Sequence, residues 1–304
     1  MNIQENRESP DFELSHRSWG HLGSFRAMAS PCELLIATED EHLAREMMSI
    51  AAFEAMRIEQ KFSRFIEGNP LWKINHAAGT LSLIDAEIAS LLQFARQCHQ
   101  LSDGRFDISA GPLMKLWRFD GGELPEAADI EQARALVDFS RVDFNERHLQ
   151  FPSGMSLDFG GIAKEYAVDR VAYLLAEKWP TISVLVNFGG DIACPVSKGA
   201  DNEPWQVGIE NPQRLDSAGA RLEIRKGALA TSGDTRRFIE KDGQRFGHII
   251  DPGTGYPVVK APRSVTVLGP NCVTAGMLAT MAMLEGEKAE TFLSEQEVEF
   301  KCFR

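Results

Sequence analysis

Residues Ser156–Asp169 read S-L-D-F-G-G-I-A-K-E-Y-A-V-D, and the fold is organised around this stretch. An apolar, strand-like approach ends at Gly160 and Gly161, and a helical pattern with one apolar face then begins. The paired glycines are therefore expected at a helix N-terminus, where free backbone N–H groups and the helix dipole attract phosphate. Glycine also lets a ligand approach the main chain closely. Because such turns also carry glycine for packing alone, both interpretations stay open here.

Two aspartates accompany glycine pairs in this chain. Asp158 precedes the first pair, and its carboxylate would repel a phosphate unless it bonds to a metal, a ribose hydroxyl or a base N–H. A second run, Phe188-Gly189-Gly190-Asp191, ends the apolar strand pattern of residues 182–187. Two such turns, each beside an aspartate, predict that backbone from both lines one cleft.

Composition sets the outer limits of the function. The chain has 304 residues, 43% of them apolar and 25% charged, which is enough for one large domain or two intertwined ones. The net charge of -12, without a Lys/Arg cluster, argues against a nucleic-acid partner. No apolar run of membrane-spanning length occurs. The five scattered cysteines, never spaced C-x-x-C, favour reduced thiols over a disulfide framework or a zinc site.

The first twenty residues mix charges and contain neither an apolar run nor a lipidation cysteine. We therefore expect a polar N-terminal tail over residues 1–20 and a single large domain over residues 21–304. The same observation predicts a cytoplasmic location for the sequence as it stands, or a periplasmic one if a leader was removed.

The remaining patterns mix helices with short strands. Residues 41–65 and 85–99 have helical periodicity, and residues 21–37 predict a hairpin. Residues 102–121 are dense in glycine, aspartate and aromatics, which predicts a specifically shaped loop of the kind that carries ligand contacts. Residues 228–237 read as a polar loop. Long helices, scattered strands and hairpins together predict an α+β fold.

Three single residues have both an ordinary and a functional interpretation. Met28 either fills the core or lines a ligand site. His248, directly before the turn D-P-G-T-G-Y-P, is either structural or a ligand contact. Ser232 suggests a nucleophile, but no G-x-S-x-G elbow surrounds it, which argues against a serine hydrolase.

With these stretches in view, the chain resembles the ApbE family of FAD:protein FMN transferases, which attach FMN through a phosphoester to a threonine or serine of a target protein. The motifs follow one another in the family's order over nearly the whole chain. They are F-R-A-M at Phe25, S-R-F at Ser63, D-G-R-F-D-I-S-A-G-P-L-M-K-L-W at Asp103, D-F-G-G-I-A-K-E-Y-A-V-D at Asp158, N-F-G-G-D at Asn187, A-T-S-G-D at Ala230, H-I-I-D-P-G-T-G-Y-P at His248 and S-V-T-V-L-G-P at Ser264.

The resemblance implies two intertwined α/β lobes, T-fold-like in part, with FAD in the cleft between them. It implies an isoalloxazine near Met28 and Phe65. The other FAD-binding positions that it implies are Arg105, Phe106, Asp107, Asp158, Lys164, His248 and Ile250. A cation such as Lys164, just inside a phosphate-binding helix start, can neutralise diphosphate.

The resemblance also implies magnesium beside the diphosphate, held by the main-chain oxygen of Gly161 and by side chains of the last helix, including Thr280. The expected reaction is attack of an acceptor protein's hydroxyl on the FMN phosphorus, with AMP as the leaving group. No catalytic residue, particular acceptor protein or oligomeric state is predicted.

This chain departs from the family pattern at three places. The family usually shows A-D-x-x-x-T on the last helix, whereas this chain keeps Thr280 but carries Gly276 in place of the aspartate. Ala29-Ser30 stands where the family prefers Gly-Thr, and Glu165 stands where it prefers glycine. Since Mg²⁺ generally keeps one or two protein carboxylates, the loss at Gly276 predicts severely weakened metal binding.

Three activities therefore stay open. The first is an active metal-dependent transferase in which Asp158, Thr274 or Asp251 substitutes for the lost aspartate. The second is an FAD-binding protein with weak or no transferase activity. The third is an FAD pyrophosphatase, in which water replaces the acceptor hydroxyl.

Overall fold

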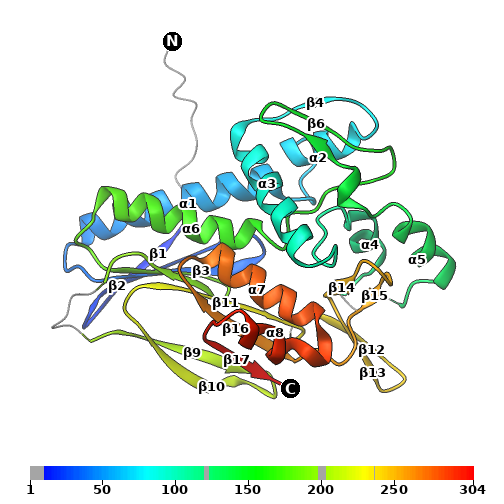
Figure 1. The fold of residues 1–304 in the computed structure, drawn as a ribbon. Coiled ribbons are helices and arrows are strands. Elements are labelled where there is room, and N and C mark those ends of the chain that lie inside the picture. The colour runs from blue at the N-terminus through cyan, green and yellow to red at the C-terminus, as the bar shows by residue number, and fades with distance from the viewer. Residues whose placement is uncertain (1–9, 120–122, 198–202, 236) are drawn as a thin grey trace, which may run out of the picture.

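A computed structural model describes residues 10–119, 123–197, 203–235 and 237–304, and its centre is an antiparallel sheet under helices (Figure 1). Eight strands follow one another across this sheet in the order β1-β2-β3-β7-β8-β11-β16-β17. The sheet strands are β1 (Glu13–Arg17), β2 (Gly20–Ala27), β3 (Ser30–Ile36), β7 (Val184–Phe188), β8 (Asp191–Cys194), β11 (Gly227–Gly233), β16 (Ser264–Gly269) and β17 (Phe300–Phe303). The expected α+β class is confirmed.

The sheet begins earlier than the sequence predicts. Strand β1 pairs with β2 from Glu13 opposite Ser24 to Arg17 opposite Gly20. Strand β1 therefore lies within the stretch expected to be a polar tail. Its polar composition is explained by its place at the edge of the sheet, where one side of the strand is solvated. The hairpin expected over residues 21–37 is confirmed as β2 and β3.

Three helices cover one face of the sheet, as Figure 1 shows: α1 (Glu41–Phe62), α6 (Ala163–Lys178) and α7 (Cys272–Leu284). Asp40 caps α1 by accepting hydrogen bonds from the N–H groups of His42 and Leu43. Asn271 caps α7 in the same way through the N–H of Thr274. Smaller elements after α7 are η2 (Gly286–Lys288) and α8 (Ala289–Glu295).

Strand β7 shows how the two faces of the sheet are used. Val184, Val186 and Phe188 pack into the main core beneath the helices. Leu185 points to the other face, where it belongs to a second cluster with Trp205. This alternation is the period of a strand that is buried on both sides. The second face is covered by the hairpin of β9 (Trp205–Asn211) and β10 (Arg214–Ile224), which lies below the sheet in Figure 1.

The polar loop expected over residues 228–237 is wrong for most of its length. Residues Gly227–Gly233 form β11, a central strand that pairs with β8 and β16. Ala228 and Ala230 are small enough for α7 to pack closely over them, and both are buried. The hydroxyl of Thr231 lies 2.9 Å from that of Thr266, so the strand's polar groups are satisfied within the sheet. Small alanines and a hydroxyl-bearing threonine do not give the pattern of β-branched and apolar residues that identifies a strand in a sequence.

A second group of elements, coloured cyan to green at the upper right of Figure 1, projects beside the sheet. It comprises α2 (Pro70–His76), α3 (Ala86–Leu101), α4 (Gly111–Leu116), α5 (Ala127–Arg134), η1 (Phe139–Arg141) and a small sheet of β4 (Ser82–Leu83), β6 (His148–Gln150) and β5 (Asp143–Phe144). Two short hairpins lie next to α4 and α5: β12 (Phe238–Lys241) with β13 (Gln244–Gly247), and β14 (Ile250–Asp251) with β15 (Tyr256–Pro257). Within the described ranges, no helix is long and apolar enough to cross a bilayer.

Candidate functional site

Lys164 connects the two glycine turns. It is the second residue of α6, and its Nζ lies 2.7 Å from Oδ2 of Asp191, which directly follows the second glycine pair. A Cβ at Gly189 would lie 3.8 Å from the same Nζ. The structure therefore brings the second Gly-Gly-Asp turn against a side chain from the helix that the first turn begins.

The charge of Lys164 is already matched inside the protein. Burial alone would lower its pKa, but the carboxylates of Asp191 and Glu165 outweigh burial and raise it. Asp191 is 1% exposed and also accepts a hydrogen bond from the N–H of Thr231. The ammonium group of Lys164 therefore holds the two turns together, and its contact with the diphosphate of FAD stays a prediction.

Asp158 is paired with Arg64. Its Oδ2 lies 3.2 Å from Nε of Arg64, and its Oδ1 accepts a hydrogen bond from the N–H of Gly160 at 2.8 Å. The backbone N–H of Asp158 donates to the carbonyl of Ile108, which ties this stretch to the preceding loop. The only signal for Arg64 was its place in the S-R-F motif at Ser63.

The start of α6 keeps the features of an anion site. Ile162 occupies the N-cap position and makes no side-chain capping hydrogen bond. Gly160 and Gly161 are both exposed, and a Cβ at Gly161 would lie 3.6 Å from the ring of Phe106. Uncapped N–H groups at a helix N-terminus are available to an anion.

Asp107 orders the loop from within. Its Oδ1 accepts hydrogen bonds from both the N–H and the hydroxyl of Ser109, each at 2.6 Å, and its Oδ2 accepts one from the N–H of Phe139. Nε2 of His99 lies 3.5 Å away, and this carboxylate raises the pKa of His99. The side chain of Asp107 is only 4% exposed and supports the conformation of this loop, while the FAD contact expected of it stays a prediction.

Its neighbour Arg105 lies at the surface of the same loop. NH1 of Arg105 is 2.9 Å from Oε1 of Glu285, at the end of α7, and the side chain is about half-exposed. Phe106, in contrast, is buried in the main core.

The other expected FAD positions differ in exposure. Met28 occupies the tip of the β2–β3 hairpin with φ of 51° and packs partly against the main core. Phe65 is 79% exposed, with the Arg64 guanidinium 4.5 Å from its ring. Nδ1 of His248 is buried and has no hydrogen-bond partner among the described residues, and burial lowers the pKa of this residue. Ile250 is buried in a cluster with Trp117.

Thr280 and Gly276 lie on one face of α7, one helical turn apart. The hydroxyl of Thr280 is 2.8 Å from that of Ser232 on β11. A Cβ at Gly276 would meet Glu165, at 2.6 Å from Cγ and 3.0 Å from Oε1. The two departures at Glu165 and Gly276 are therefore in direct contact, which the sequence alone did not indicate.

Glu165 is unusual for a carboxylate. It is 8% exposed, and its Oε2 has no hydrogen-bond partner among the described residues. Burial, followed by the charge of Asp191, raises its pKa to about 7.

The oxygen donors near α7 could hold a hard cation only if the cation takes few of its ligands from the protein and the rest from water and phosphate. Across the described residues, no three His, Cys, Asp or Glu side chains form a group that could hold a metal. Asp158 is paired with Arg64, and Oδ1 of Asp251 accepts the N–H of Gly253 within its own turn. The available donors are oxygens, which is the ligand type that Mg²⁺ takes together with water and phosphate.

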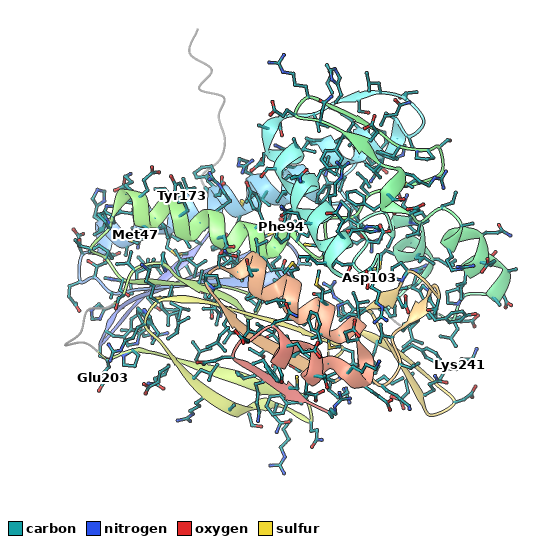
Figure 2. All side chains as sticks on the ribbon, viewed as in Figure 1. Met47, Phe94, Asp103, Tyr173, Glu203 and Lys241 are labelled. Atoms are coloured by element: carbon teal, nitrogen blue, oxygen red, sulfur yellow. The ribbon has the colours of Figure 1, made fainter. Side chains whose placement is uncertain are left out.

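Two surface hollows lie elsewhere. One, of about 760 Å³, is lined by the start of α3 and by residues 144–147. The other, of about 570 Å³, lies between α6, β8 and the start of α7 and includes Phe94 and Tyr173, which Figure 2 labels on neighbouring helices. Neither includes a residue expected to bind FAD.

The ApbE family profile matches residues 28–303. This chain belongs to the ApbE family. Two ApbE relatives, both called FAD:protein FMN transferase, support the assignment. The protein from Klebsiella pneumoniae (strain 342) is 32% identical over 262 residues, which cover 84% of this chain and 79% of the relative. The protein from Haemophilus influenzae is 30% identical over 252 residues, covering 79% and 72%.

Solved ApbE structures have the same fold. The crystal structure of the ApbE protein from Thermotoga maritima superposes with a TM-score of 0.84 at 26% identity, covering 96% of this chain and 94% of the other. The apo form of the flavinyl transferase ApbE from Pseudomonas stutzeri gives 0.81 at 26% identity, covering 95% and 90%. This ApbE chain is therefore an enzyme of the flavin transferase kind by family and fold.

Proposed function

We propose that this protein is an FAD:protein FMN transferase that moves FMN from FAD to a threonine or serine hydroxyl of an acceptor protein. The observation that carries the proposal is the pair of relatives with this name, which are 32% and 30% identical and are matched over 79% and 72% of their own lengths. Substrate and partner are accordingly FAD and a protein that bears the acceptor hydroxyl.

The start of α6 is the proposed seat of the diphosphate. Gly160 and Gly161 are exposed there, and the N-cap residue Ile162 makes no side-chain capping hydrogen bond. Arg64 and Arg105 are the proposed cations at its edge, since both lie on loops beside it and neither is fully buried. Arginine binds phosphate oxygens through several parallel N–H donors.

The isoalloxazine is proposed to lie between the tip of the β2–β3 hairpin and Phe65. Phe65 supports this position because a 79% exposed aromatic ring is available for stacking. Met28 supports it because its thioether lies at a strained hairpin tip beside the second glycine turn, whose Gly189 N–H donates to Pro31. His248 and Ile250 stay as proposed contacts of the same ligand.

In the proposed reaction, the acceptor oxygen forms a bond to the FMN phosphorus while the bond from that phosphorus to the bridging oxygen breaks. The bridging oxygen leaves with AMP, and the hydroxyl proton passes to solvent. Mg²⁺, when bound, would draw negative charge from the phosphate oxygens. Gly161, through its main-chain oxygen, and Thr280, through its hydroxyl, are the proposed protein donors, and the Lys164–Asp191 ion pair holds the two glycine turns in position.

The test is to incubate the purified protein with FAD, Mg²⁺ and an acceptor domain that carries a flavinylation threonine, then to weigh the acceptor and separate the nucleotides. FMN mass on the acceptor with an equal amount of AMP is the expected result. AMP with free FMN would identify a pyrophosphatase instead. Unchanged FAD that nonetheless binds would identify a flavin-binding protein without transferase activity, and the proposal would then be wrong.

A further inference from the structure

Glu165 and Gly276 share one side-chain space between α6 and α7. Gly276 is buried, and a Cβ there would lie 2.6 Å from Glu165 Cγ. Because protein interiors are close-packed, any larger residue at position 276 would have to displace Glu165. The two positions therefore hold one carboxylate between them, and it extends from α6 instead of from α7.

That carboxylate has an unused oxygen. Glu165 is 8% exposed, and its Oε2 has no hydrogen-bond partner among the residues that the structure describes. A buried carboxylate oxygen normally bonds to a donor or a cation. Lys164, the adjacent residue, has its Nζ 2.7 Å from Asp191 instead. The free oxygen consequently points to a ligand that brings positive charge.

The neighbouring groups are oxygen donors. Thr280 lies one turn along α7 from Gly276, on the same face, and its hydroxyl contacts that of Ser232 at 2.8 Å. Gly161 lies four residues before Glu165, at the exposed entry to α6. Since the described residues form no cluster of three His, Cys, Asp or Glu ligands, one carboxylate would decide whether a hard cation binds here.

We infer that Glu165 supplies from α6 the carboxylate of a divalent-cation site shared with Thr280, and so replaces a carboxylate at position 276 of α7. This inference rests on the proposed function, because phosphate oxygens of FAD would complete the shell of the cation. It also changes the expectation from the sequence: loss of the aspartate at position 276 does not leave the site without a carboxylate, and Asp158, Thr274 or Asp251 is not needed as a substitute.

The experiment measures Mn²⁺ binding to the full chain by the electron paramagnetic resonance signal of free Mn²⁺, with FAD present and acceptor protein absent. Glu165→Gln keeps the shape of the side chain and removes its charge. It is expected to weaken Mn²⁺ affinity by about tenfold or more. Glu177→Gln, an exposed position on the same helix, is the matched control and should leave the affinity unchanged.

A variant that exchanges the two residues tests whether the carboxylate can extend from either helix. Its result does not depend on whether Glu165→Gln folds. Glu165→Gly combined with Gly276→Asp returns the carboxylate to α7, and it should bind Mn²⁺ within about threefold of the unmodified protein. Gly276→Asp alone places two carboxylates in one space. The melting temperature of this single variant should therefore fall below those of the exchange variant and the unmodified protein. Wild-type affinity in Glu165→Gln, or no recovery in the exchange variant, would overturn the inference.

Failure of the inference can be told apart from failure of the proposed function. FAD binding is followed separately, by quenching of flavin fluorescence without metal. If FAD binds but Mn²⁺ affinity does not depend on Glu165, only the role of Glu165 is wrong. If the unmodified chain binds no Mn²⁺ with FAD bound, the inference is wrong while FAD binding stands. If FAD does not bind, the proposed function fails first.

Discussion

Asp169 of α6 caps the start of α7 by accepting a hydrogen bond from the N–H of Cys272 at 2.7 Å. Its second oxygen accepts the N–H of Val273 at 2.8 Å. One side chain thus satisfies two of the free N–H groups of a neighbouring helix. This pair of bonds fixes the position of α7 relative to α6, and with it the contact between Glu165 and Gly276.

Substituting Asp169→Asn should lower the free energy of unfolding by about 1–3 kcal/mol, because an amide retains one acceptor oxygen and leaves a buried N–H without a partner. Urea unfolding followed by tryptophan fluorescence measures the change. Asp143→Asn, at an exposed position on β5, is the control and should stay within about 0.5 kcal/mol of the unmodified protein. Equal effects of the two substitutions would show that Asp169 does not hold the helices together.

The β2–β3 hairpin stores strain at its tip. Met28 and Ala29 have φ of 51° and 54°, a region that costs an L-residue about 1–2 kcal/mol. Ala29→Gly removes the penalty at one position but adds chain entropy to the unfolded state, so we expect a net gain of about 0.5–1 kcal/mol.

Thermal unfolding of Ala29→Gly checks this expectation. Ala27→Gly, in the adjacent strand, should instead lower the stability by about 0.5–1 kcal/mol, because the alanine there is buried and has ordinary strand geometry. If both glycines destabilise, the tip is not strained. A stabilised Ala29→Gly variant with weaker FAD binding would further indicate that the strain positions Met28.

Sequence periodicity predicted the elements whose burial follows a simple pattern. Helix α1 and the β2–β3 hairpin are such elements, because each has one buried face. Strand β11 was not predicted because its residues are mostly small or bear hydroxyl groups, although the strand lies in the interior of the sheet. The glycine turns were predicted as a ligand site from local chemistry alone.

The partners of the site residues could not be predicted in the same way. Arg64 with Asp158 and Glu165 with Gly276 are contacts between segments far apart in the chain, and no local pattern encodes which of them meet. The role of Asp107 could not be predicted either. In the sequence, an aspartate in a glycine-rich loop looks the same whether its carboxylate binds a ligand or accepts hydrogen bonds from its own loop.

Substitutions should show that Asp107 mainly stabilises the fold and that Arg105 mainly binds the ligand. Asp107→Asn removes part of an acceptor set used by Ser109 and Phe139, so the free energy of unfolding should fall by about 1–3 kcal/mol. Arg105→Gln breaks only a half-exposed ion pair, so stability should change by less than about 1 kcal/mol. FAD titrations should show the larger loss of affinity in Arg105→Gln. The reverse ranking would return Asp107 to the ligand site.

Glu87 makes the stability of the helical layer depend on acid. It accepts hydrogen bonds from Arg57 and Lys61 of α1 and from the hydroxyl of Tyr166 of α6, at 2.6–2.8 Å. Burial would raise the pKa of Glu87, but these donors outweigh burial and lower it from 4.5 to about 2.

Because the folded-state pKa of Glu87 lies below the unfolded value, its contribution to stability is complete above about pH 4.5 and is lost as the pH falls toward 2. Discounted for partial exposure, the contribution is about 2 kcal/mol. Urea unfolding of Glu87→Gln should thus show a deficit of that size at pH 7 that shrinks steadily between pH 4.5 and pH 2. Glu41→Gln, which breaks an exposed pair with Arg45, should show a deficit of less than about 1 kcal/mol at every pH. A deficit in Glu87→Gln that stays constant as the solution is acidified would mean that the charge of Glu87 does not stabilise the packing of α1, α3 and α6.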